Sequence, residues 1–391
     1  MPTRPCWVEI CTRNLEDNFR FLAEVAAPHA ELLAIVKANA YGHGLELCAP
    51  AAVRGGARWL GVTSVEEGVA ARAVCPDAQI LVIGGVFSGQ GAAVVRHGLT
   101  VVAWEPWQLD ELEQAGRAAG TRVQVHLEVD TGMSRQGAAP SELTLLLGRF
   151  GADSPLVLDG VMTHLFAADE ANGLVTAEQL AQMRGVLSGM VAAGVKPAWC
   201  NVGNSAALLA GQAAAIGAMA AEHGMKALLR PGLALYGLAP DFDPAFETEP
   251  ITLTEARRKL QPVLSWKSRV VTVRAVQPGV AVGYNGTFVA TEPMRLALVA
   301  VGYADGLDRR LGNRFSLLVR GQRAPLVGRV SMDQAVVDVT EIADVAAGDE
   351  VVLLGAQGSE AISAFEHAEA AGTIPWEIFT GIGPRVGRVG V

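Results

Sequence analysis

The chain has 391 residues, of which 50% are apolar and 18% are charged. This length exceeds what one hydrophobic core usually serves, and the composition is unlike that of a disordered protein, so we expect two folded domains. The 31 basic and 40 acidic residues give a net charge of −9 without a basic tract, which argues against nucleic acid and an anionic membrane as partners.

The first 240 residues alternate short β-rich runs with helical patterns, such as the one predicted over Val65–Val74. Eight strand–helix units predict a (β/α)8 barrel of the TIM type over residues 1–240. The alternative, an open doubly wound sheet, is disfavoured because no GxGxxG follows any of these strands. The predicted strands are Leu32–Lys37, Trp59–Thr63, Gln79–Gly84, Thr100–Ala103, Val123–Val129, Leu158–His164, Pro197–Val202 and Ala227–Leu229.

From residue 241 onward, Gly and Pro turns separate β-branched runs, and long helical patterns are absent until about residue 360. This pattern predicts a mostly β C-terminal domain over residues 241–391. Its predicted strands are Val263–Val273, Met294–Val301, Phe315–Val319, Ala324–Val330, Gln334–Val339 and Glu350–Leu354.

The cysteines and the N-terminus indicate in which cellular compartment the protein is expected. Five cysteines, an odd number without a CxxC pair, favour reduced thiols over a disulfide framework or a zinc site. The N-terminus has no apolar signal-peptide core, and no long uninterrupted apolar run follows. We therefore expect a cytoplasmic protein without a membrane span or a metal site.

A lysine, Lys37, ends the first predicted barrel strand in the string AIVKANAYGHG (residues 34–44). The C-terminal ends of barrel strands carry the chemistry of such folds, and apolar surroundings lower a lysine pKa, which favours Schiff-base formation. A lone lysine would more often be a solvated strand end. The whole string, however, resembles the cofactor-attachment signature of the alanine racemase family. That resemblance implies pyridoxal 5′-phosphate (PLP) covalently bound to Lys37, with its phosphate contacted by Tyr41.

Two later segments fall where barrel enzymes hold phosphate, after the seventh and eighth strands. The first is Asn204-Ser205-Ala206-Ala207, which alone would be a helix cap. The second is Arg230-Pro231-Gly232-Leu233. The resemblance makes them a phosphate cradle built from Ser205, Gly232 and Leu233.

Two basic residues are expected beside the cofactor ring. The resemblance implies that Arg230 bonds the pyridine nitrogen and that His164, at the end of the sixth strand, stacks on the ring and orders Arg230. A guanidinium can only donate, so the ring nitrogen would stay unprotonated, which favours racemisation over transamination. A salt-bridged arginine and a hydrogen-bonded core histidine are the alternatives.

The loop after the fifth strand carries Arg135, which matches the family arginine at the substrate carboxylate and the cofactor's phenolic oxygen. Many members have a carbamylated lysine where this chain has Glu128. We expect Glu128 to supply that negative charge and hold Arg135, although a structural ion pair elsewhere is the alternative.

The second base that racemisation needs is expected in the β domain. Tyr284 lies in Tyr-Asn-Gly-Thr, a hairpin sequence that resembles the family motif bearing the catalytic tyrosine. Positive charge near Arg230 and His164 is expected to lower its pKa. In the family this domain reaches the barrel of the other subunit, which implies a homodimer with shared sites. The same resemblance places Tyr303 at the substrate entrance and the Met332 backbone at the substrate carboxylate.

The resemblance covers roughly residues 5–388 and predicts a PLP-dependent racemase that interconverts L- and D-alanine for peptidoglycan. One departure is Pro384, which stands where the family usually has a phosphate-contacting tyrosine. It leaves a serine or broad-specificity racemase as the alternative. A PLP-carrier protein is disfavoured by the β domain. A decarboxylase of related fold is disfavoured by Arg230, because such enzymes need an acidic partner for the ring nitrogen.

Overall fold

The computed structural model describes residues 4–170, 173–243 and 250–391. Contacts divide the chain into two units. The barrel unit comprises residues 13–40 and 48–261, and the β unit comprises residues 1–12, 41–47 and 262–391. Within the described residues, no helix is both long and apolar enough to cross a membrane.

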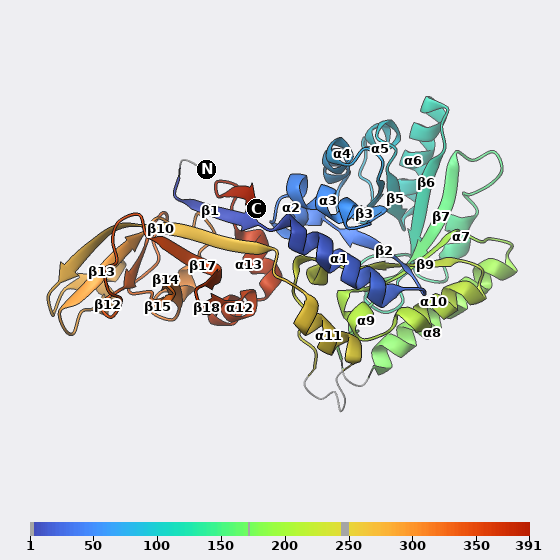
Figure 1. The fold of residues 1–391 in the computed structure, drawn as a ribbon. Helices are drawn as coiled ribbons and strands as arrows, with labels where there is room; N and C mark the ends of the chain where they lie inside the picture. Colours follow the sequence, from blue (N-terminus) through green and yellow to red (C-terminus); the bar gives the residue numbers. More distant parts are fainter. Residues whose placement is uncertain (1–3, 171–172, 244–249) are drawn as a thin grey trace. The chain divides into compact units, whose positions relative to one another are not determined.

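The barrel unit contains a closed barrel of eight parallel strands, ordered β2 to β9 around the ring (Figure 1). This confirms the predicted (β/α)8 fold. The strands are β2 (Glu31–Ile35), β3 (Trp59–Val62), β4 (Gln79–Val82), β5 (Thr100–Ala103), β6 (Val123–Glu128), β7 (Leu156–Met162), β8 (Trp199–Asn204) and β9 (Lys226–Arg230).

Helices connect these strands and cover the outside of the ring (Figure 1). The segment between β8 and β9 forms two helices, α9 and α10, interrupted near Gly211, which has φ 77°. The helices are α1 (Thr12–Ala26), α3 (Leu45–Arg54), α4 (Val65–Val74), α5 (Gly91–Arg96), α6 (Pro106–Ala119), α7 (Leu143–Leu147), α8 (Leu174–Ala192), α9 (Ser205–Leu209), α10 (Ala213–Glu222), η1 (Leu233–Tyr236) and α11 (Ile251–Lys259).

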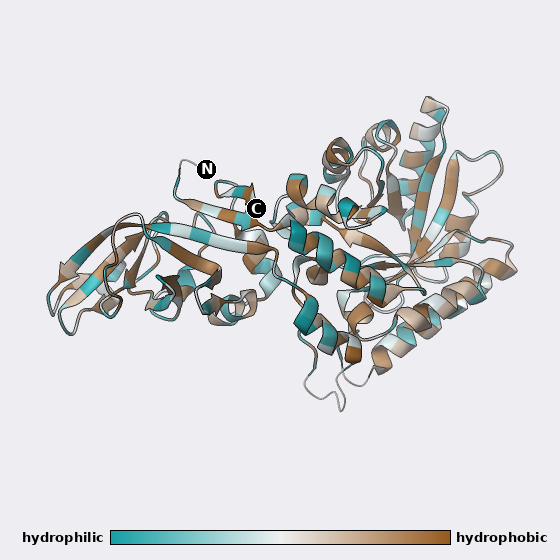
Figure 2. Ribbon diagram, viewed as in Figure 1, coloured by the Kyte–Doolittle hydropathy of each residue, from teal (hydrophilic) through white to brown (hydrophobic). Residues whose placement is uncertain are grey.

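Burial explains why these segments adopt this arrangement. Barrel strands β3 and β5 are buried along their whole length, as expected for parallel strands with helices outside and side chains inside. They are mostly brown in Figure 2, whereas α1 carries much more teal. On α1, Leu15, Phe19 and Leu22 are buried at helical spacing, so one stripe of the helix packs and the rest faces water.

The β unit is built on a nine-stranded sheet and a two-stranded hairpin. Its first strand, β1, pairs with β10 and β19, so residues 1–12 group with this unit although they precede the barrel. The elements are β1 (Cys6–Ile10), β10 (Leu264–Val276), β11 (Ala281–Val282), η2 (Tyr284–Gly286), β12 (Phe288–Val289), β13 (Met294–Val299), η3 (Arg309–Leu311), β14 (Ser316–Val319), β15 (Gln322–Pro325), β16 (Ala335–Asp338), β17 (Glu350–Gln357), β18 (Glu360–Ile362), α12 (Ala364–Ala371), α13 (Pro375–Gly381) and β19 (Gly387–Gly390).

Candidate active site

Lys37 lies just beyond β2, at the start of the short turn α2 (Lys37–Tyr41). Ala38, Asn39 and Ala40 have φ of 52°, 52° and 55°, so the turn is left-handed. Each such residue is unfavourable without glycine, by about 1–2 kcal/mol. Clusters of such residues usually mark functional sites.

Burial and charge both disfavour the ammonium form of Lys37. Burial is the largest cause of a lowered Lys37 pKa, and the positive charges of Arg135 and Arg230 add to it, whereas Glu67 acts in the opposite direction. A lowered pKa makes the free amine more available for covalent chemistry and for proton transfer. The structure therefore gives this lysine the electrostatic setting expected from the sequence.

Arg230 ends β9 and is buried in a dense set of acceptors. Its Nη1 donates to Asn201 O at 2.8 Å and to Asn201 Oδ1 at 2.5 Å. Its Nη2 donates to Thr163 O at 2.9 Å and to His164 Nδ1 at 3.1 Å. Its Nε has no partner among the described residues and stays available as a donor. Burial lowers the Arg230 pKa to about 10, which still leaves the guanidinium charged at neutral pH.

His164 is neutral in this setting. Burial, followed by the charges of Arg230, Arg135 and Lys37, lowers its pKa to about 3. Because Nδ1 accepts from Arg230, the ring proton resides on Nε2. The expectation that His164 adds positive charge beside a catalytic tyrosine is therefore wrong. Burial, aided by the nearby Arg230, Arg135 and Lys37, keeps the ring unprotonated.

A polar relay beneath Arg230 was missed from the sequence. Asn201 Nδ2 donates to His126 Nδ1 at 3.4 Å, and His126 Nε2 donates to Asp159 Oδ2 at 3.2 Å. His126 is fully buried among the barrel side chains, edge-on to Trp59. The relay fixes the Asn201 amide so that its oxygen faces Arg230. A histidine among the inward-facing positions of β6 was the available signal.

Glu128 is buried at the end of β6 but does not hold Arg135. Its carboxylate accepts from Gln136 Nε2, and it forms no ion pair with Arg135 in the described part of the chain. Burial raises the Glu128 pKa, opposed by Gln136 and the more distant Arg230 and Arg135. Arg135 itself is exposed. The expected ion pair is therefore wrong: the loop turns Gln136, one residue further on, toward the carboxylate.

Ser205 begins α9 and is buried against the turn after β9. Its Oγ accepts from the amide of Gly232 at 2.9 Å and from that of Ala234 at 3.3 Å. Asn204 supplies the helix cap, since its side chain accepts from the amide of Ala207. The structure thus brings Ser205 together with the Gly232–Leu233 turn, and the cap is formed by the residue before it.

The remaining predicted site residues belong to the β unit. Burial raises the pKa of Tyr41 to about 12, so its hydroxyl stays protonated at neutral pH. Tyr284 lies between β11 and β12 with 65% of its surface exposed. Tyr303 and Met332 are 42% and 52% exposed. Their loops are tied together by bonds from the amides of Tyr303 and Ala304 to Ser331 O and Met332 O.

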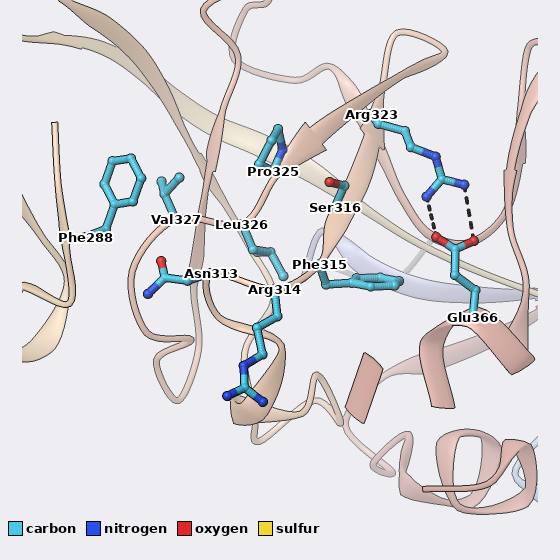
Figure 3. Close-up of a pocket in the computed structure, with 10 residues that line it drawn as sticks. All are labelled: Phe288, Asn313, Arg314, Phe315, Ser316, Arg323, Pro325, Leu326, Val327 and Glu366. Carbon is cyan, nitrogen blue, oxygen red and sulfur yellow. Dashed lines mark hydrogen bonds and ion pairs between the residues drawn. The ribbon is translucent and has the colours of Figure 1, made fainter. Parts of the chain in front are cut away.

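The β unit also carries a hollow of about 350 Å³ (Figure 3). Arg323 forms an ion pair with Glu366 at its edge, and Arg314 points away from that pair. Phe288, Asn313, Phe315, Ser316, Pro325, Leu326 and Val327 complete the lining. The one carboxylate is thus already paired, and the hollow contains no lysine, histidine or cysteine that would serve as a nucleophile or base.

The barrel cluster fits PLP in the chemistry of its donors. Lys37 offers an amine for an aldehyde, Arg230 offers an unused N–H for a ring nitrogen, and Ser205 offers a hydroxyl beside backbone amides for a phosphate. No group of three metal-ligating side chains occurs in the described residues. The arrangement can therefore hold a phosphorylated, aldehyde-bearing heterocycle.

Comparison with known proteins agrees with this chemistry. The sequence model of the alanine racemase N-terminal domain matches residues 10–240, and that of the C-terminal domain matches residues 263–390. A protein described as alanine racemase in Symbiobacterium thermophilum is 41% identical over 386 residues, covering 98% of this chain and 97% of the relative.

Solved structures give the same result. Alanine racemase from D-cycloserine-producing Streptomyces lavendulae superposes with a TM-score of 0.88 at 35% identity, covering 100% of this chain and 98% of the other. Alanine racemase from Bartonella henselae, described with covalently bound pyridoxal phosphate, superposes with a TM-score of 0.83 at 28% identity over 100% of both chains.

Proposed function

The chain belongs to the alanine racemase family, and we propose that it interconverts L- and D-alanine with Lys37 and Tyr284 as its two bases. One observation carries this proposal: Lys37 and Arg230 both lie at or just beyond the C-terminal ends of the barrel strands. Hydrogen bonds fix Arg230, and the pKa of Lys37 is lowered.

PLP bound to Lys37 would supply the electron-withdrawing system that makes the substrate Cα proton acidic. Ser205, Gly232, Leu233 and Tyr41 would hold its phosphate. The Nε–H of Arg230 would bond the ring nitrogen, and neutral His164 would lie against the ring. Because four acceptors already fix Arg230, it can donate without reorganising.

Inversion at Cα needs a proton removed on one face and returned on the other. Lys37 Nζ would take the proton of D-alanine, and Tyr284 Oη would take that of L-alanine. Each would return its proton in the reverse direction. Arg135 would bind the substrate carboxylate, joined by the Met332 backbone, with Tyr303 at the entrance. The exposure of Arg135 suits a contact with an incoming anion.

We infer a homodimer with shared sites, in which Tyr284, Tyr303 and Met332 complete the site of the other subunit. Support comes from the exposure of these residues on the β unit. A solvent-exposed tyrosine can act on a substrate proton only if another subunit brings that substrate to it. We further propose a cytoplasmic role in supplying D-alanine for peptidoglycan. All five cysteines are free, as reduced surroundings would leave them.

A wider substrate range is the second candidate, and Pro384 is the observation that favours it. Pro384 is exposed and follows Gly383, whose amide donates to Asp305 O in the loop that carries Tyr303. A proline ring offers no hydroxyl to a phosphate or a substrate at that position. Turnover on L-serine and larger amino acids, compared with L-alanine, decides between strict and broad selectivity.

The two-base assignment is tested with Tyr284→Phe. We expect racemisation to fall at least about 100-fold, because one general base is lost, while bound PLP is retained. Exchange of the D-alanine Cα proton with solvent deuterium should continue, since Lys37 remains. Val289→Thr, on the same hairpin, is the control. Racemisation within about twofold of wild type would remove Tyr284 from the mechanism.

A further inference from the structure

Glu67 lies in the first turn of α4, the helix that follows β3, and β3 is the strand beside the one that leads to Lys37. Ser64 caps this helix and accepts from the amide of Glu67 at 3.3 Å. In a capping box the glutamate would reach back to the amide of its own cap. The Glu67 carboxylate instead accepts from the amide of Thr63 at 2.8 Å and leaves its other oxygen for a different segment.

That other segment is the left-handed turn after Lys37. Glu67 Oε1 accepts from the amide of Ala38 at 2.6 Å and from that of Asn39 at 3.4 Å. A backbone bond from the amide of Ala40 to Val36 O joins the turn to the residue before Lys37. An unfavourable backbone conformation persists only when its surroundings hold it. The carboxylate of Glu67 contributes to holding the turn through the amides of Ala38 and Asn39.

The charge of Glu67 acts on the pKa of Lys37 in the opposite direction to the two arginines. Arg135, from the loop after β6, and Arg230, from β9, are positive and favour loss of the Lys37 proton. His164, beyond β7, is neutral. Glu67, from α4, is the negative group in this set. Lys37 must both take and deliver a proton, so its ammonium form needs stabilisation by a nearby negative charge. Two arginines alone would favour the free amine in both directions of the reaction.

We propose that Glu67 is a positioning residue for Lys37. It fixes the backbone turn that aims the amine and balances the two arginines so that the amine can carry a proton during turnover. This inference rests on the proposed role of Lys37. Glu67 would touch neither substrate nor cofactor, so its effects would reach the reaction through Lys37 alone.

The test measures the reactivity of Lys37 in cofactor-free protein. Wild type, Glu67→Gln and Glu67→Ala are mixed with pyridoxal phosphate across a pH series, reduced with borohydride and digested, and the labelled lysine is located by mass. The rate of labelling at Lys37 reports both geometry and protonation. The matched control is Glu66→Gln, since the neighbouring Glu66 bonds Gln90 instead of the turn.

Glu67→Gln keeps one acceptor oxygen, which can face the turn, and loses the charge together with the acceptor for the amide of Thr63. We expect its labelling profile to move to lower pH, so that it is labelled faster than wild type on the acid side. Glu67→Ala loses the acceptor for the turn as well. We expect labelling of Lys37 to slow about tenfold or more at every pH, because the amine would no longer be held in position. Glu66→Gln should match wild type.

An unshifted Glu67→Gln profile would overturn the inference, even if Glu67→Ala fails to fold, because a purely structural glutamate would not move the protonation of Lys37. In that case wild-type labelling at Lys37 would leave the proposed function standing. Wild-type labelling at another lysine would refute the proposed role of Lys37, and the inference with it.

Discussion

Acid should destabilise the barrel through His164, and His164→Asn should relieve that effect. The folded-state pKa is about 3 against 6.5 for the free side chain. Because the folded pKa is the lower one, the unfolded state binds more protons between these values, and stability falls as the pH drops through that window. At pH 5, which is 1.5 units below 6.5, the loss is about 2 kcal/mol relative to pH 7.

The replacement by asparagine retains an acceptor for Arg230 and cannot titrate. Urea unfolding of the cofactor-free protein, followed by circular dichroism, measures the unfolding free energy at both pH values. Between pH 7 and pH 5, wild type should lose about 2 kcal/mol more than His164→Asn. His29→Asn, at an exposed position, is the control. Equal losses in wild type and His164→Asn would refute the reasoning.

Three further changes follow from the contacts. Ser205→Ala removes the hydroxyl proposed to hold the phosphate and the acceptor that orients the amides of Gly232 and Ala234, so we expect about 1–3 kcal/mol weaker PLP binding by equilibrium dialysis; unchanged affinity would contradict the cradle. Gly160→Ala places a methyl group 2.5 Å from His126 Cε1, and the unfolding free energy should fall by at least about 1–3 kcal/mol. His367→Leu removes a buried ring whose nitrogens lack partners in the described residues and whose pKa is lowered to about 4 by burial. The β unit should then lose about 2 kcal/mol less stability between pH 7 and pH 5 in urea unfolding, and an unchanged loss would count against it.

The fold was predictable where local pattern and packing agree. The predicted strand Thr100–Ala103 and the predicted helix over Val65–Val74 match the observed bounds. Strand β1 was missed because its partners, β10 and β19, lie more than 250 residues further along the chain. Pairing at that separation leaves no periodic signal in the strand itself.

The candidate site was predictable where a residue lies at or just beyond the end of a barrel strand, as Arg230 and Lys37 do. The contacts around these two residues were harder to predict from the sequence. The contact of Glu67 with the turn after Lys37 was not predicted, because it depends on how neighbouring strands lie in three dimensions. Glu128 was predicted to hold Arg135, yet its partner is Gln136, because loop geometry decides which side chain turns inward.

The central claim is that Lys37 and Tyr284 act in one shared site, and subunit mixing tests it most directly. Lys37→Ala and Tyr284→Phe should each lack racemase activity, because each variant has lost one of the two bases. Unfolded together and refolded, they should form hybrid dimers with one intact site, and L-alanine racemisation should recover to about one quarter of the wild-type rate. No recovery, in a mixture whose hybrid dimers are demonstrated by mass, would contradict the shared two-base site.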